Sequence, residues 1–217
     1  MRKTAFAASV FLLSVFVILL PAGDVKAQMR PLPFYVGVFG GYTMPDDMQV
    51  NAPGLSYDID MENGGMVGAK FGFIPPEARF LALEVELNGM WNDYDRQVVV
   101  TTPFSGTEEG DVSLANFMFN VKFRYPEGRL HPYAGFGIGW STVTLDGREY
   151  ADGILVSSYD EEDTAFAWQF LAGLTYDITP TIDLELGYRY FYTEPDFAVS
   201  DVEFKSHIAT VGLNFHF

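Results

Sequence analysis

The sequence predicts an all-β protein, an eight-stranded antiparallel up-and-down transmembrane β-barrel with short periplasmic turns and long acidic extracellular loops. Apolar residues recur at every second position along eight segments, and the joins between these segments are short and long in turn. Hydrophobic residues make up 48% of the 217-residue chain. Beyond the N-terminal part, however, no apolar stretch approaches the ~20 residues that a spanning helix needs. We therefore expect this chain to cross a membrane with strands.

The first 27 residues predict a signal peptide that is removed after export through the Sec pathway. Arg2 and Lys3 form a basic start, an apolar run follows over 5–20, and small residues surround the expected cleavage point. The alternative is an uncleaved membrane anchor, for which the apolar run is short. The mature domain is then 28–217.

Charge and cysteine content exclude several classes of partner and anchor. The formal net charge is −16, and it becomes −18 when Arg2, Lys3 and Lys26 leave together with Asp24. Nucleic-acid binding is not expected, because contacts to phosphates need a basic surface. The chain has no cysteine, so it has neither disulfides nor a cysteine-linked lipid anchor.

Each predicted strand has one apolar and one polar face. In the third segment, Leu83, Val85 and Leu87 share one parity, whereas Glu84 and Glu86 take the other. Tilted membrane strands need about 9–11 residues. The expected strands are 33–43, 65–74, 79–91, 113–125, 131–143, 165–178, 181–192 and 205–217.

The joins between the segments set the topology. Three are short and contain Pro or Gly, at 75–78, 126–129 and 179–181. The four long ones are 44–64, 92–112, 144–163 and 193–204. Because such barrels have short periplasmic turns and long outer loops, this alternation predicts eight strands with both termini in the periplasm.

With that topology, aromatic residues gather at two levels, as expected at two membrane–water interfaces. The outer level contains Trp91, Trp140, Trp168, Tyr42, Tyr190 and Tyr192. The inner level contains Phe73, Tyr125, Tyr176 and Phe217.

Three segments of this pattern resemble the OmpA-like family of small outer-membrane β-barrels, the outer membrane protein beta-barrel domain. They are PYAGFGIG at 132–139, LELGYRY at 184–190 and TVGLNFHF at 210–217. The resemblance implies the outer membrane of a Gram-negative bacterium. It also implies that the assembly machinery of that membrane recognises the last strand, through Gly212, Phe215 and Phe217. The chain differs from full-length OmpA in lacking a peptidoglycan-binding domain, so a cell-wall tether is not expected.

Charged residues of the polar parity are predicted to meet inside the barrel. These lumen residues are Lys70, Glu84, Glu86, Lys122, Arg124, Asp183, Glu185 and Arg189. An eight-stranded barrel is just wide enough for side chains to fill, so we expect a structural plug of ion pairs. Inward glycines Gly135, Gly137 and Gly139 are expected to make room for large side chains such as Tyr35 and Phe39. The alternative is a small porin-like channel with a narrow, charge-gated lumen.

The outer loops are strongly acidic. They contain 21 carboxylates against only Arg96 and Arg148, which gives a net charge of −19. Because lipopolysaccharide phosphates are also negative, we expect loosely bound Ca²⁺ or Mg²⁺ between the two. The densest cluster, and the weak metal candidate, is Asp160, Glu161, Glu162 and Asp163. No defined calcium-loop spacing is present, and solvated, mobile loops are the alternative.

Catalysis has little support in the sequence. Lipid A modification by a serine hydrolase needs a base close to its nucleophile, and the chain has only His131, His207 and His216. His207 could meet Ser157 or Ser158, but no spacing requires it. We therefore expect a monomeric, non-catalytic barrel without cofactors, embedded in outer-membrane lipid and lipopolysaccharide. Its role would be structural or in surface interaction, through membrane integrity, adhesion or loop-mediated binding.

Overall fold

A computed structural model of the chain describes residues 33–46, 48–52, 55–59, 61–99, 105–151, 154–197 and 200–217. The chain divides into two units, Met1–Arg30 and Pro31–Phe217, and the described residues all belong to the second. The predicted signal peptide lies outside the described residues. In the part of the chain that the structure describes, no helix has the length and apolar character needed to span a membrane.

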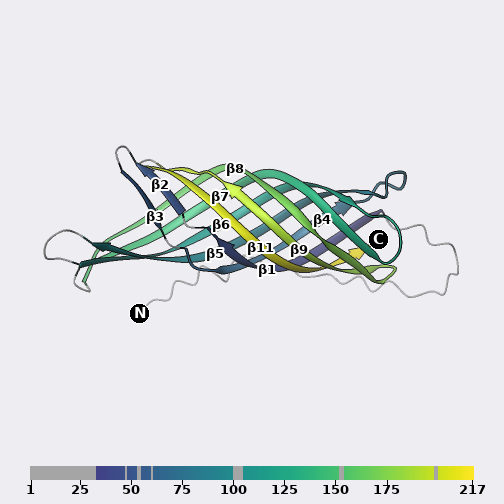
Figure 1. Cartoon of the computed structure of the whole chain (residues 1–217), viewed down its shortest axis with the longest axis horizontal. Helices are drawn as coiled ribbons and strands as arrows, with labels where there is room; N and C mark the ends of the chain where they lie inside the picture. The colour runs from purple at the N-terminus through teal and green to yellow at the C-terminus, as the bar shows by residue number, and fades with distance from the viewer. Residues whose placement is uncertain are drawn as a thin grey trace. The chain divides into compact units, whose positions relative to one another are not determined.

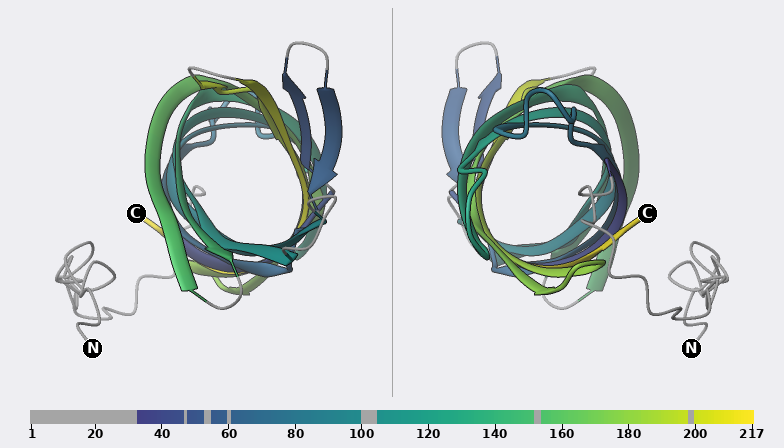
Figure 2. Two further views of the ribbon diagram at one scale, coloured as in Figure 1. Left: turned by 90° about the vertical axis from the view of Figure 1, so that its left-hand side faces the viewer. Right: turned by 90° about the vertical axis from the view of Figure 1, so that its right-hand side faces the viewer.

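Eight antiparallel strands form a closed barrel, which confirms the predicted fold class (Figures 1 and 2). The barrel strands are β1 (Phe34–Pro45), β4 (Gly64–Phe73), β5 (Leu81–Val99), β6 (Ser105–Arg124), β7 (Leu130–Ala151), β8 (Ile154–Thr179), β9 (Ile182–Thr193) and β11 (Ser200–His216). Each pairs with the next along the chain, and β1 pairs with β11 to close the ring. Closure leaves no open sheet edge within the barrel wall, as a lipid environment requires.

The two faces of each strand differ as the alternation predicts. On β6, Phe119, Val121 and Phe123 point outward and are 39–60% exposed, whereas Asn120 and Lys122 between them are at most 3% exposed. The same division holds around the barrel, with an apolar outer surface and a polar or tightly packed interior. An apolar surface of this extent is expected on a protein that faces lipid.

Aromatic side chains line both ends of the outer surface. At the outer end, Trp168 stacks on Tyr192 with ring centroids 5.2 Å apart, and Trp91 is 48% exposed. At the inner end, Phe34 packs against Phe73 and Phe217, at 5.0 and 6.3 Å between centroids. These positions suit the two membrane interfaces.

At the inner end, three short turns connect the barrel strands. The turn between β6 and β7 contains Gly128 at φ 78°, in the left-handed region that favours glycine. All three turns contain proline, with Pro75 and Pro76 in the β4–β5 turn, Pro126 in the β6–β7 turn and Pro180 in the β8–β9 turn. Proline and glycine therefore set the turns, as the sequence predicts.

The outer end differs from the prediction, because two of the long joins continue as paired strand. Residues 92–99 of β5 pair with 105–112 of β6, and the β7–β8 hairpin extends from 143 to 163. Outside the membrane both faces of a strand can be wet, so the apolar alternation ends although the backbone pairing continues. A small hairpin, β2 (Met48–Ala52) and β3 (Leu55–Ile59), pairs with the outer part of β11, as does β10 (Asp196–Phe197).

Candidate functional site

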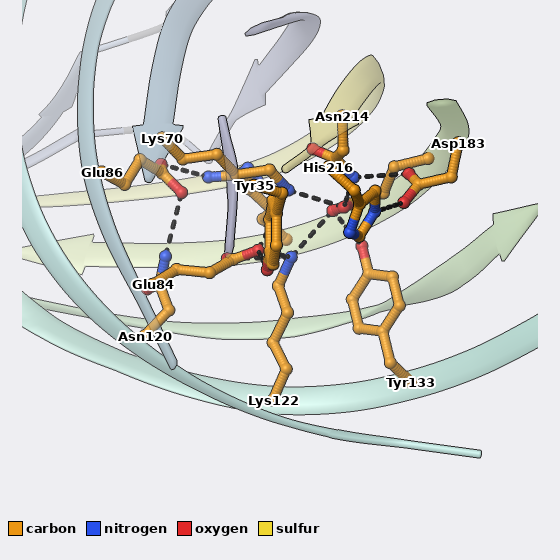
Figure 3. Close-up of polar contacts among 12 residues, drawn as sticks. Tyr35, Lys70, Glu84, Glu86, Asn120, Lys122, Tyr133, Asp183, Asn214 and His216 are labelled. Atoms are coloured by element: carbon orange, nitrogen blue, oxygen red, sulfur yellow. Dashed lines mark hydrogen bonds and ion pairs between the residues drawn. The ribbon is translucent and has the colours of Figure 1, made fainter. Parts of the chain in front are cut away.

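Four charged side chains form a closed set of ion pairs in the lumen, named here the charge ring (Figure 3). Lys70 Nζ lies 3.2 Å from Glu84 Oε1 and 2.6 Å from Glu185 Oε2. Lys122 Nζ lies 3.0 Å from Glu84 Oε2 and 2.8 Å from Glu185 Oε1. Each lysine therefore meets both glutamates, and all four side chains are at most 8% exposed.

Local sequence makes room for the two lysines. A Cβ added at Gly37 would lie 2.8 Å from Lys70 Cε, and one at Gly135 would lie 3.0 Å from Lys122 Cγ. Glycine at these two inward positions leaves the volume into which each lysine stem extends. Gly37 and Gly135 thus allow the two lysine side chains to reach the barrel axis.

A second group of polar side chains lies next to the charge ring. Arg189 pairs with Glu86, which is fully buried, and lies over the Phe39 ring at 4.4 Å. Glu86 also accepts hydrogen bonds from Asn88 Nδ2 at 2.8 Å and Asn120 Nδ2 at 2.9 Å. Buried charges are costly unless they are paired and hydrogen-bonded, and both conditions hold here.

Hydroxyl and amide groups add hydrogen bonds to three of the four carboxylate oxygens of the charge ring, whereas Glu84 Oε2 meets only the Lys122 ammonium. Tyr35 donates to Glu84 at 2.5 Å, and Tyr133 donates to Glu185 at 2.8 Å. Asn214 Nδ2 links Glu185, at 3.1 Å, to Asp183, at 2.6 Å. Together these bonds join strands that are far apart in the sequence into one network.

The glycines that accommodate the large aromatic side chains are not the ones predicted. The Tyr35 ring lies over Gly72, where an added Cβ would be 2.0 Å from Cζ. Phe39 lies over Gly68 in the same way, at 2.3 Å. The predicted glycines Gly135, Gly137 and Gly139 instead face Lys122, Asn120 and Met118. Register and strand tilt decide which positions meet across the lumen, and neither can be derived from alternation alone.

Arg124 is the predicted lumen residue that the structure separates from the rest. It lies at the periplasmic mouth and is partly exposed, and none of the described carboxylates forms an ion pair with it. Its Nε is shielded from solvent without a hydrogen-bond partner. The prediction that Arg124 belongs to the charge network is therefore wrong. As the last residue of β6, it lines the inner cavity below Glu84 and Glu185 but forms no ion pair with either.

A cluster of apolar side chains packs in the outer half of the lumen, among buried polar residues such as Thr43, Asn92 and Asn116, and the alternation did not predict it. We name this group the apolar plug: Phe39, Met66, Met90, Val112, Leu114, Met118, Val143, Ala167, Phe191, Phe204 and Ile208. All occupy inward positions of their strands and are at most 8% exposed. Methionines at 66, 90 and 118 on the otherwise polar face were the available sign of this packing.

The described contacts of the three histidines are with aspartates, a backbone carbonyl and a tyrosine, and the Ser157 side chain lies outside the described side chains. At the periplasmic mouth, His131 Nε2 lies 3.1 Å from Asp177 Oδ2, and His216 Nε2 lies 2.6 Å from Asp183 Oδ2. His207 points outward at the outer rim, where its Nδ1 lies 2.5 Å from the Tyr188 hydroxyl. Within the described side chains, no histidine ring hydrogen-bonds a serine hydroxyl.

The candidate metal ligands are also not drawn together. In β8, Asp160, Glu161, Glu162 and Asp163 follow one another in extended backbone, so successive side chains point to opposite faces. The Asp163 carboxylate accepts a hydrogen bond from the Asp196 backbone at 2.8 Å. Among the described residues, no group of three or more acidic, histidine or cysteine side chains is arranged to hold a metal ion.

Comparison with known proteins places this geometry in context. A family model described as "Outer membrane protein beta-barrel domain" matches residues 11–217. An opacity protein of Neisseria gonorrhoeae is 29% identical over 111 residues, which are 42% of this chain and 46% of that protein. The chain thus spans about half the length of the curated relatives it matches.

Two solved structures share the fold. Neisserial surface protein A has 18% sequence identity and a TM-score of 0.54, covering 85% of this chain and 97% of that one. OprG of Pseudomonas aeruginosa has 11% identity and the same TM-score, covering 87% and 97%. At these identities the likeness concerns the fold alone.

Proposed function

Because this chain belongs to the family of outer membrane protein beta-barrel domains, and so to the Gram-negative outer membrane, we propose that it is a sealed structural barrel with a surface-interaction role. In this proposal, the barrel neither conducts solutes nor catalyses a reaction. A sealed wall would support membrane integrity, and the strands that continue beyond the outer rim would present a binding surface.

The filled lumen is the observation that carries the proposal. On its periplasmic side the charge ring neutralises its own charges, and on the outer side the apolar plug closes the axis. Met66, Met90, Met118, Phe191 and Ile208 are each at most 2% exposed. An ion on this path would have to break buried ion pairs and then cross apolar packing, and both steps are costly.

Four aspartates support a role in surface interaction. Asp93, Asp111, Asp146 and Asp160 stand directly opposite one another on β5, β6, β7 and β8, and all four are exposed. We name this line of carboxylates the acidic row. Asp93 lies two residues beyond Trp91 on β5, so the row is just outside the outer aromatic level, on the part of the strands that continues past it. Its charge favours cationic partners.

Further partners of the barrel are proposed on the sequence features alone. Lipopolysaccharide and outer-membrane lipid would surround the apolar face, and the assembly machinery would recognise Gly212, Phe215 and Phe217. Residues 1–27 would direct export through the Sec pathway, and the folded domain would act as a monomer. A role for divalent cations at 160–163 stays a prediction.

Planar-bilayer recording tests the sealed lumen. The full mature chain is expected to be electrically silent, and so is a Phe119→Ala control on the lipid face of β6. A variant with both Met90→Gly and Met118→Gly removes two plug side chains and is expected to leak. Reproducible unitary steps from the unaltered chain would refute the proposal.

Surface display tests the acidic row. Cells that present the full chain are expected to bind polylysine-coated beads more than polyglutamate-coated ones. Changing all four aspartates of the row to asparagine should abolish the difference, whereas a periplasmic control, Glu77→Gln with Glu127→Gln, should retain it. Equal binding by the row variant and the unaltered chain would contradict this role.

A further inference from the structure

Two adjoining cavities open at the periplasmic end of the lumen, named here the vestibule. They share Ile74, Arg124 and His216 in their walls. The outer cavity, which includes space open to solvent, is about 590 Å³ and is bordered by residues of all three short turns. The inner cavity, about 300 Å³ when space open to solvent is included, has room for only a water-sized group and reaches the lower side of the charge ring. The vestibule is therefore a recess that opens to the periplasm and does not continue into the outer half of the lumen.

The carboxylates of the vestibule already have partners. Asp177 faces His131 at 3.1 Å, and Asp183 faces His216 and Asn214, both at 2.6 Å. Higher up, Glu84 and Glu185 are held by the two lysines of the charge ring. These acids consequently offer little attraction to a further cation.

Arg124 is in the opposite situation. Its backbone N–H donates to Phe80 O at 2.7 Å, which fixes the end of β6 beside β5 and places Arg79 at the same cavity. The Arg124 Nε is buried without a hydrogen-bond partner, and within the described chain no carboxylate pairs with the guanidinium. A desolvated donor on a permanently charged group is unfavourable until an acceptor binds it.

We propose that the vestibule is an oxyanion site, in which Arg124 binds a phosphate or carboxylate group from the periplasmic side. A guanidinium presents a planar set of donors that matches these anions in a bidentate manner. Arg79 adds a second positive charge at the entrance, and the imidazoles of His131 and His216 lie in the wall. The proposal does not depend on the surface role, because the two sites lie at opposite ends of the barrel.

The walls of the vestibule are suited to hold a ligand without rearrangement. Pro76, Pro126 and Pro180 border the outer cavity, one from each short turn. Proline limits the backbone freedom of these turns, so less entropy is lost when a ligand is bound. The Arg124 backbone is paired on both sides, with Phe80 just before β5 and with Tyr133 of β7.

Arginine Nε–H NMR of the full mature chain in maltoside micelles tests the site, with inorganic phosphate as the probe. The Arg124 signal should shift saturably with phosphate, and more than with chloride at equal ionic strength. Sodium acetate should compete. Arg79→Gln should weaken phosphate binding by roughly two- to fivefold, the value of one exposed charge pair. Arg129→Gln, at an exposed turn residue outside the cavity walls, should leave it unchanged.

A comparison of membranes identifies the source of the anion. In nanodiscs that contain phosphatidylglycerol, an Arg124 signal already at its phosphate-bound position would assign the site to a lipid headgroup. A signal that moves only when phosphate is added would assign it to a soluble anion. If phosphate moves the Arg124 signal no further than chloride does, the proposal is wrong, and this readout needs no variant to fold.

Discussion

Breaking the charge ring at Glu185 should destabilise the barrel strongly. Glu185→Gln keeps the shape of the side chain but removes two ion pairs, with Lys70 at 2.6 Å and Lys122 at 2.8 Å. Two buried ammonium groups then share Glu84, which leaves one buried charge unbalanced. Removing one partner of a buried pair typically costs ~3–5 kcal/mol, and we expect a loss of that size in the free energy of unfolding.

A double-mutant cycle makes the prediction specific to the ring. Lys122→Met alone should cost a similar amount, because it leaves two carboxylates with one lysine. The double variant retains a neutral Lys70–Glu84 pair, so its cost should fall well below the sum of the single costs. Urea unfolding in lipid vesicles, followed by tryptophan fluorescence, measures all three. Glu127→Gln, at an exposed turn residue, is the control, with a change within ~0.5 kcal/mol.

Additive costs in this cycle, to within ~0.5 kcal/mol, would refute the closed arrangement of the ring. They would mean that the lysines and glutamates do not share partners.

Two further predictions concern close packing and the acidic row. Gly68→Ala should cost ~1–3 kcal/mol in the same unfolding assay, because the new Cβ would meet Phe39 Cζ at 2.3 Å, whereas Gly89→Ala, which has space for a Cβ, should cost much less. Equal costs would contradict the lumen packing. Outside the membrane, partial desolvation and the neighbouring Asp93 carboxylate raise the pKa of Asp111. Protonated Asp111 contributes stability that is present below the unfolded pKa of about 3.9 and is lost as pH rises through the folded pKa. Asp111→Asn should therefore raise the melting temperature at pH 7 and not at pH 3. A variant that melts at the wild-type temperature at both values would count against this repulsion.

Much of the barrel wall was predictable from the sequence, because lipid imposes one rule on each strand. Hydrocarbon excludes charge from alternate positions. The side chains of Lys122 and Glu84 must therefore face the lumen. Once the face is known, the small radius of an eight-stranded barrel brings opposite charges together. The fold and the membership of Lys70, Glu84, Lys122 and Glu185 in one interior follow from these two constraints.

Features set by register, or located outside the membrane, were not predictable in this way. Tyr35 lies over Gly72 because of the relative shift of β1 and β4, which alternation does not determine. Strand pairing continues to Val99 because water on both faces removes the apolar pattern but not the hydrogen bonds. The absence of an ion-pair partner for Arg124 among the described residues depends on its height in the barrel, two positions beyond Lys122 of the ring.

A single-cysteine spin-label scan tests whether alternate side chains of β6 face lipid, and the chain has no native cysteine to interfere with labelling. Labels at each position from 117 to 122 on β6, in lipid vesicles, would report collisions with oxygen, which is concentrated in hydrocarbon. Frequent collisions are expected at positions 117, 119 and 121, and few are expected at Met118 and at the polar positions 120 and 122. Collision rates that do not alternate along the strand, or that alternate with the opposite phase, would contradict a lipid-facing wall around a filled lumen.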